Sequence, residues 1–290
     1  MTNKSVKSDW KTVGLDLPKK HLSLAIESGN LAHAYLLSGP SAIGKTTFAI
    51  EVSEKLLGSS VVSSPDAWIV DQTEAIGVEQ IRDLKARFSL SSFGPGKKVA
   101  VIASADAMTL EAANALLKLI EEPNKETVIF LISNKHGGLP ETLRSRCQQI
   151  ICVPLIDSDI GSLLDRLEIS KKLQTEIIQL VHGRPGLAYA LATNQETMET
   201  YRDWDKLLLA NLEGSLGDRL SILAPLSSME APDLMRMLEY WEIALYSDFT
   251  SKTDLSRALF VLETSRTRLQ RNESKKLILD SLALQLQPSI

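Results

Sequence analysis

The chain has 290 residues, of which 44% are hydrophobic and 23% are charged, and its formal net charge at pH 7 is −4. This is the profile of a globular protein large enough for one α/β domain and smaller helical units. The negative net charge excludes an overall positive field that would draw the chain to nucleic acid, so any DNA contact would have to be a local patch.

Membrane and zinc signals are both missing from the sequence. No apolar run reaches the ~18 residues of a membrane span, and the polar segment MTNKSVKSDWKTVG lacks the apolar core of a secretion signal. The two cysteines, Cys147 and Cys152, are too few for a disulfide framework or a four-cysteine zinc site. We therefore expect two reduced thiols, no structural zinc, no membrane contact and a cytoplasmic location.

The first half of the chain alternates between helical and extended patterns. Apolar spacing and helix-forming residues predict helices at 19–30, 45–58, 78–90 and 110–123, and Thr109 is placed to N-cap the last of them. Short apolar runs predict strands at 34–39, 66–71, 99–103, 127–133 and 148–153. Strands that alternate with helices favour a parallel sheet covered on both faces.

Strand signals stop after about Pro154. Three short helices are expected up to 193, with breaks near Glu168 and at HGRPG, and long amphipathic helices follow from about Asn194. The pattern predicts an α/β domain at 1–154, a small helical lid at 155–193 and a C-terminal helical bundle at 194–290.

A phosphate-binding loop follows the first predicted strand. GPSAIGKT fits G-x-x-x-x-G-K-[ST] and opens a helix, which is the context that the motif requires. Its glycines let backbone N–H groups converge on an anion at a helix N-terminus, Lys45 would bridge the terminal phosphates, and Thr46 would bind Mg²⁺. We expect ATP, or ADP, with Mg²⁺ at Gly39, Pro40, Ser41, Ala42, Ile43, Gly44, Lys45, Thr46 and Thr47.

Two kinds of P-loop protein fit this motif. A small-molecule kinase should have an arginine-rich lid, but the region after 154 has only scattered basic residues and ends in a bundle far larger than a lid. An NTPase of the oligomeric kind fits better.

Several long segments resemble one family. LAHAYLLSGPSAIGKTT, EAANALLKLIEEPNKETVIFLIS and LPETLRSRCQQI are similar, in this order, to segments of the bacterial clamp-loader ATPase group, the gamma/tau and delta-prime subunits of DNA polymerase III. The resemblance implies an AAA+ P-loop NTPase domain with a parallel sheet, a helical lid and a C-terminal helical collar. These match the three units expected from the pattern.

The resemblance also implies roles for individual residues. Arg146, in Ser145-Arg146-Cys147, matches an arginine that projects into the neighbouring subunit's ATP site, unless it only caps or pairs at a sheet edge. Asn134 lies where the family has its sensor residue, although a simple turn asparagine is as good an interpretation. Val13 and Gly14 resemble the segment near the adenine.

Acidic residues are missing where the family has them. Asp-Glu-x-Asp of the family ATPases matches Ala103, Ser104, Ala105 and Asp106, so the metal-linked acid and the general base are absent. Asp106 comes three residues after the usual acid, ~10 Å away at strand rise, and could either replace it or cap the following helix.

Two further departures concern the lid and zinc. The family's lid arginine falls near Gly186, with Arg184 two positions early, and the zinc module of many members is missing. Together with the intact P-loop and Ser-Arg-Cys motif, these departures resemble the delta-prime type more than the gamma/tau type.

A short basic stretch is the candidate DNA contact. Arg82, Lys85 and Arg87 lie on a predicted helix that faces DNA in the family, but the interleaved Glu79 and Asp83 also fit a solvated helix face.

The leading hypothesis is a delta-prime-like subunit that binds nucleotide, hydrolyses little or none itself and lends Arg146 to a neighbouring ATPase. Its implied partners are gamma/tau and delta subunits and, through the assembly, the sliding clamp and primer-template DNA. One alternative is a hydrolysing gamma/tau-like ATPase that uses Asp106, and another is a nucleotide-binding regulatory protein without a DNA role.

Overall fold

The computed structural model describes residues 10–70, 75–89, 92–94, 96–122, 126–134, 137–248 and 252–286. Its internal contacts divide the chain into two compact units, Met1–Leu163 with Gly183–Leu187 and Leu164–His182 with Ala188–Ile290. The segment 155–193, predicted as a lid, contributes to both units. The division into 1–154, 155–193 and 194–290 therefore stays a prediction.

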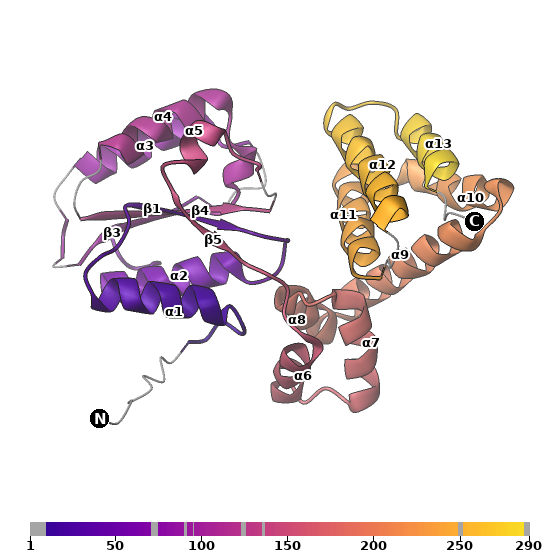
Figure 1. Ribbon diagram of the computed structural model, residues 1–290, viewed down its shortest axis with the longest axis horizontal. Coiled ribbons are helices and arrows are strands. Elements are labelled where there is room, and N and C mark those ends of the chain that lie inside the picture. Colours follow the sequence, from indigo (N-terminus) through magenta and orange to yellow (C-terminus); the bar gives the residue numbers. More distant parts are fainter. Residues whose placement is uncertain are drawn as a thin grey trace. The chain divides into compact units, whose positions relative to one another are not determined.

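A parallel sheet forms the centre of the first unit (Figure 1). Its five strands lie in the order β2-β3-β4-β1-β5, and every neighbouring pair is parallel. The strands are β1 (Ala34–Ser38), β2 (Ala67–Val70), β3 (Lys98–Ile102), β4 (Thr127–Ser133) and β5 (Gln148–Ile151). Each predicted strand is present with ends shifted by at most two residues, and the predicted parallel sheet is confirmed.

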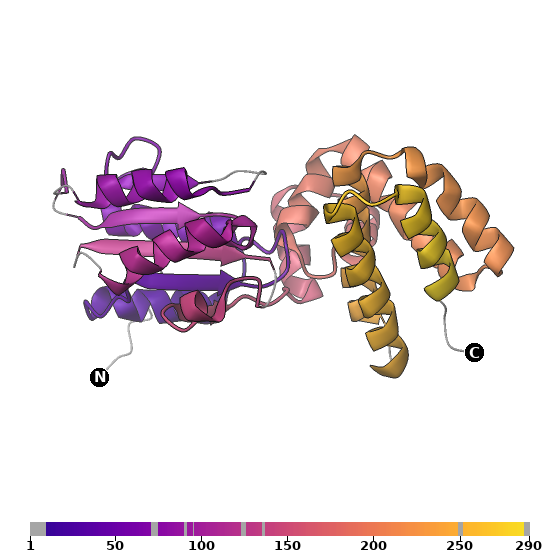
Figure 2. The same ribbon diagram turned by 90° about the horizontal axis from the view of Figure 1, so that it is seen from above.

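Helices cover both faces of this sheet (Figures 1 and 2). One face packs on α1 (Asp16–Glu27) and α2 (Lys45–Leu57), and the other on α3 (Val78–Ser89), α4 (Leu110–Glu121) and α5 (Glu141–Arg144). Successive strand residues point to opposite faces, so Tyr35 and Leu37 join one core while Leu36 joins the other. Such two-sided burial explains why the strands read as continuous apolar runs.

Helix α1 begins at Asp16, three residues before the predicted start at 19. Pro18 lies in its first turn, where a missing N–H costs no intrahelical hydrogen bond. The proline therefore lies inside the helix and does not mark its beginning.

The strand register brings the ends of β1 and β4 together. Ser38 pairs with Ser133, whereas β3 stops at Ile102, which pairs with Leu131, two residues before the end of β4. A short 3-10 helix, η1 (Ala105–Ala107), follows β3. Thr109 then caps α4 as predicted, because its side chain accepts a hydrogen bond from the Ala112 N–H.

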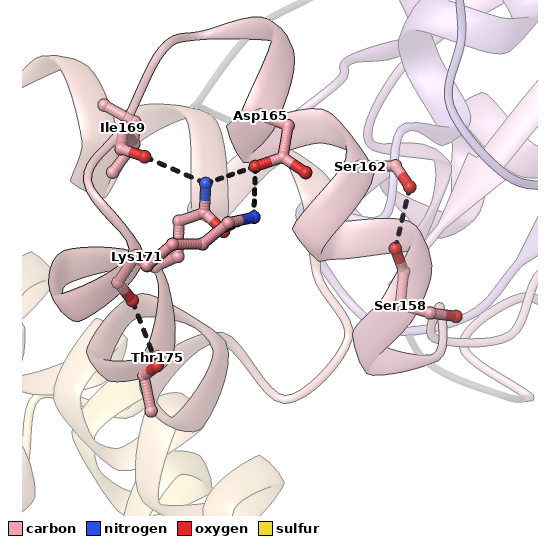
Figure 3. Close-up of polar contacts among 7 residues, drawn as sticks. Ser158, Ser162, Asp165, Ile169, Lys171 and Thr175 are labelled. Atoms are coloured by element: carbon pink, nitrogen blue, oxygen red, sulfur yellow. Dashed lines mark hydrogen bonds and ion pairs between the residues drawn. The ribbon is translucent and has the colours of Figure 1, made fainter.

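Three short helices follow the sheet as predicted: α6 (Asp157–Arg166), α7 (Lys171–Val181) and α8 (Pro185–Thr193). A polar cluster closes the turn between α6 and α7 (Figure 3). Lys171 Nζ and Gln174 Nε2 each lie 2.6 Å from Asp165 Oδ1, and Gln174 Nε2 also donates to the Ile169 carbonyl. These bonds satisfy polar groups at the break that the sequence placed near Glu168.

The second unit ends in a helical bundle that matches the predicted pattern of long helices. Its members are α9 (Gln195–Glu213), α10 (Leu216–Leu223), the 3-10 helix η2 (Ala224–Ser228), α11 (Ala231–Asp248), α12 (Lys252–Gln270) and α13 (Lys275–Gln285). Trp241 is fully buried in this bundle, and its indole N–H donates to the Trp204 carbonyl over 2.8 Å. Among the described helices, none is both long and apolar enough to cross a membrane.

Candidate nucleotide-binding site and the Ser-Arg-Cys motif

The P-loop connects β1 to α2 through two conformationally special glycines. Gly39 has φ +152°, and a Cβ there would lie 2.1 Å from the Cys152 carbonyl oxygen. Gly44 has φ 89° and precedes α2 without any side-chain cap. The first N–H groups of an α-helix have no intrahelical partner, so a helix N-terminus that follows this glycine loop fits a phosphate group.

Lys45 lies at the base of this loop and is only 4% exposed. Its Nζ donates to the carbonyls of Gly39 and Pro40 and to Asn134 Oδ1, which is 2.9 Å away. Asn134 directly follows β4, and β4 pairs with β1, so the sheet brings these two predicted site residues together. The sensor role of Asn134 stays a prediction.

The tip of the P-loop contacts the start of α8 within the first unit. The Gly186 N–H donates to the Ala42 carbonyl over 2.8 Å, and Ala42 has a left-handed φ of 59°. A Cβ at Gly186 would lie 2.8 Å from the same oxygen. Position 186, near which the resemblance would place a lid arginine, therefore has no room for a side chain in this arrangement. Arg184, the nearby candidate, is buried.

The segment before α1 packs beside the P-loop. Gly14 has φ +65°, and a Cβ there would collide with Leu155 at 2.6 Å. The buried Glu51 of α2 holds this segment, because its carboxylate accepts hydrogen bonds from the Thr12 hydroxyl and from the N–H groups of Lys11 and Thr12. Burial raises the pKa of Glu51, but these hydrogen bonds outweigh it and lower that pKa overall.

No carboxylate occupies the positions directly after β3, since Ala103 and Ser104 stand there. Asp106 lies in η1 and makes no side-chain hydrogen bond or ion pair with any described residue. The prediction that Asp106 could cap the next helix is wrong, because Thr109 occupies that position. Within the described parts of the chain, no group of three or more His, Cys, Asp or Glu could hold a metal ion.

The Ser-Arg-Cys motif lies between α5 and β5. Arg146 is 43% exposed, and its Nε lies 2.7 Å from Glu121 Oε1 at the end of α4. Its Nη1 donates to the Thr142 carbonyl over 3.1 Å. Cys147 and Cys152 are free and buried, and burial raises the pKa of each thiol to about 11. The motif thus presents a half-exposed arginine beside a buried thiol.

The basic residues of α3 are partly engaged. Arg82 forms an ion pair with Glu79 on the same helix, and the Arg87 guanidinium lies 4.0 Å from the centroid of the Trp68 ring. Lys85 is exposed. A contact of this helix with DNA stays a prediction.

Comparisons with known proteins support the resemblance. A family model described as "DNA polymerase III, delta subunit" matches residues 60–155. A DNA polymerase III subunit delta' from Pseudomonas aeruginosa is 37% identical over 42% of this chain and 43% of its own length. The delta' subunit of Bacillus subtilis is 30% identical over 66% of this chain and 64% of its own length, so this chain matches about half of the length of these relatives.

A solved structure shares the fold. The crystal structure of a DNA polymerase III gamma subunit-related protein from Thermotoga maritima has a TM-score of 0.56 at 17% identity, over 91% of this chain and 98% of that chain. This likeness and the five-stranded parallel sheet confirm the predicted α/β fold with a parallel sheet followed by helices. The chain is therefore similar to delta' subunits of bacterial DNA polymerase III, the resemblance that its sequence predicted.

Proposed function

We propose that this chain is a delta-prime-like clamp-loader subunit that binds ATP or ADP with Mg²⁺, hydrolyses little or none itself, and supplies Arg146 to the ATP site of a neighbouring subunit. In this role it assembles with gamma/tau-like and delta-like subunits. The assembly opens a sliding clamp and places it on primer-template DNA.

One combination of features carries the proposal. The P-loop retains its glycines and Lys45, which fit a phosphate group, while Ala103 and Ser104 provide no carboxylate to hold Mg²⁺ through water or to activate one. Loss of a positioned base alone typically costs ~10²–10⁴-fold in rate. Arg146, in contrast, has an exposed guanidinium suited to phosphate.

Binding and turnover by the purified chain test the first half of the proposal. We expect the wild-type chain to bind ATP and Lys45→Ala to abolish this binding. ATP turnover by the wild-type chain should be close to the background measured with Lys45→Ala. Readily measurable hydrolysis that Asp106→Asn removes would instead support the gamma/tau-like alternative. This alternative is worth testing because Asp106 has no side-chain partner among the described residues, so its carboxylate is available for the role of the missing acid.

The second half is tested in the assembled complex. A guanidinium on a transferring phosphoryl group is worth ~10³–10⁵ in rate at its site. Arg146→Ala should leave ATP binding by this chain unchanged and slow hydrolysis by a gamma/tau-like partner. Arg271→Ala is the matched control, because Arg271 is exposed and its side chain has no described partner. Equal turnover with Arg146→Ala and Arg271→Ala would refute the arginine-finger role.

Co-purification separates this proposal from a regulatory nucleotide-binding protein. The chain should associate with a gamma/tau-like and a delta-like subunit, and the complex should load a clamp on a primed template. A chain that binds nucleotide but none of these subunits would support the regulatory alternative.

A further inference from the structure

The guanidinium of Arg146 is fixed by two acceptors from different helices. Glu121 ends α4 and contacts Nε, and the Thr142 carbonyl, in α5, accepts from Nη1. An arginine has five N–H donors, and these two contacts use one on Nε and one on Nη1. Both N–H groups of Nη2 and one of Nη1 remain for an anion.

This pair has little to do with folding stability. The side chains of Arg146 and Glu121 are 43% and 41% exposed, and half-exposed ion pairs contribute little to the free energy of folding. A long arginine side chain, however, loses much rotamer freedom when it must point in one direction. A hydrogen-bond acceptor that already holds the arginine side chain in one rotamer reduces the conformational entropy that is lost when the reaction takes place.

We infer that Glu121 is a positioning residue for Arg146, one that orients the guanidinium so that Nη2 meets the terminal phosphate bound by the neighbouring subunit. The inference rests on the proposed arginine-finger role of Arg146. The two acceptors belong to helices that pack against each other, so the direction of the guanidinium is set by the fold. Glu121 touches neither substrate nor reacting atoms and acts only through the arginine.

The experiment uses the full chain assembled with a gamma/tau-like ATPase whose own Ser-Arg-Cys arginine has been replaced, so that Arg146 is the only finger. Steady-state ATP hydrolysis is measured for Glu121→Gln, Arg146→Ala and the double variant. Glu122→Gln is the matched control, because Glu122 is the next residue, is exposed and has no described side-chain partner. Circular dichroism and co-purification verify that each variant folds and assembles.

We expect Glu121→Gln to lower kcat about ten- to hundred-fold with an unchanged KM for ATP, since a mispositioned group loses its effect in the transition state. Glu122→Gln should leave both constants unchanged. In the Arg146→Ala background, Glu121→Gln should have no further effect, because nothing is left to position. This last result would not follow from a purely structural role of Glu121.

Other outcomes would overturn the inference. A kcat that rises or stays constant with Glu121→Gln, while Arg146→Ala lowers it, rejects the positioning role and keeps the arginine finger. An equal loss from Glu121→Gln with and without Arg146 also rejects it. If Arg146→Ala itself leaves kcat unchanged, the finger assignment fails, and the positioning role fails with it.

Discussion

Thr12 and Glu51 are separated by 39 residues, yet the Thr12 hydroxyl donates to Glu51 Oε2 over 2.6 Å in a buried contact. Together with two backbone N–H groups, this bond keeps the carboxylate ionised, and the pKa of Glu51 lies below its ordinary value of 4.5. The contact ties the segment before α1 to the P-loop helix. Its strength should therefore depend on pH.

We expect Glu51→Gln to lower the free energy of unfolding at pH 7 by about 1–3 kcal/mol, the cost of losing charge-assisted bonds to a buried group. Because the folded-state pKa is lowered, the wild-type advantage is fully present above the unfolded-state pKa. It is lost as the pH falls below about 4.5 towards the folded-state value. Urea unfolding of both proteins between pH 7 and about pH 3 measures this change.

Glu54→Gln provides the control on the same helix, since the Glu54 side chain has no described partner. It should leave the unfolding free energy within about 0.5 kcal/mol of the wild type at every pH. A pH-independent difference between Glu51→Gln and the wild type would show that the carboxylate charge is not what holds the segment.

Gly186 gives a prediction in which two effects have opposite signs. Alanine is the better helix former by about 1 kcal/mol, so propensity alone predicts that Gly186→Ala stabilises α8. The new Cβ would, however, lie 2.8 Å from the Ala42 carbonyl oxygen of the P-loop. We expect the steric collision to outweigh the gain in helix propensity. Gly186→Ala should then lower the unfolding free energy by about 1–3 kcal/mol and weaken ATP binding.

Gly77→Ala is the comparison for this experiment, because a Cβ at Gly77 meets nothing within 4 Å. Urea unfolding and calorimetric ATP titration of the two variants are measured side by side. A more stable Gly186→Ala protein would mean that the contact between the P-loop and α8 gives way easily.

The helices and strands could be predicted because the sequence patterns that indicate them are local. A parallel sheet buried on both faces leaves continuous apolar runs, so β3 and β4 stand out, and Thr109 marks the start of α4 by its cap. The predicted start of α1 was three residues late, because the apolar spacing that indicated this helix does not locate its first turn. The P-loop and the Ser-Arg-Cys motif could be identified for the same reason, because each consists of residues that are neighbours in the sequence.

The remaining parts of the site depend on contacts between distant segments. Glu51 and Glu121 are glutamates on amphipathic helices, where a carboxylate is normally solvated, and nothing nearby in the sequence indicates their partners Thr12 and Arg146. The approach of Gly186 to the P-loop likewise depends on how the chain returns to the sheet after α7. Only three-dimensional packing specifies these pairs.

The two cysteines should be chemically inert in the native protein. Burial raises the pKa of both Cys147 and Cys152 to about 11, although Lys45 partly offsets this for Cys152. At pH 8 only about 0.1% of such thiols are ionised, and the thiolate is the reactive form. We expect very slow reaction with Ellman's reagent at pH 8 and rapid release of two equivalents per chain in urea. Rapid native labelling would contradict the burial of these residues.

The two interpretations of Asn134, a sensor residue that contacts the γ-phosphate of ATP and a simple turn asparagine, predict different nucleotide affinities. Its Oδ1 accepts from Lys45 Nζ over 2.9 Å, so its amide lies beside the group that would bind the terminal phosphates. As a sensor, Asn134 would donate a hydrogen bond from its amide N–H to the γ-phosphate, and a hydrogen bond to a charged group is worth about 1.5–3 kcal/mol, or about ten-fold or more in affinity. Asn134→Ala should therefore weaken ATP binding about ten-fold and leave ADP binding nearly unchanged.

Calorimetric titration of the purified chain with ATP and ADP, each with Mg²⁺, measures both affinities. Lys45→Ala should lose both nucleotides, because the lysine would contact phosphates that ATP and ADP share. A sensor acts on the γ-phosphate alone, so the ratio of the two affinities is the decisive quantity. If Asn134→Ala changes ATP and ADP binding by the same factor, Asn134 only orients Lys45 and does not distinguish the two nucleotides.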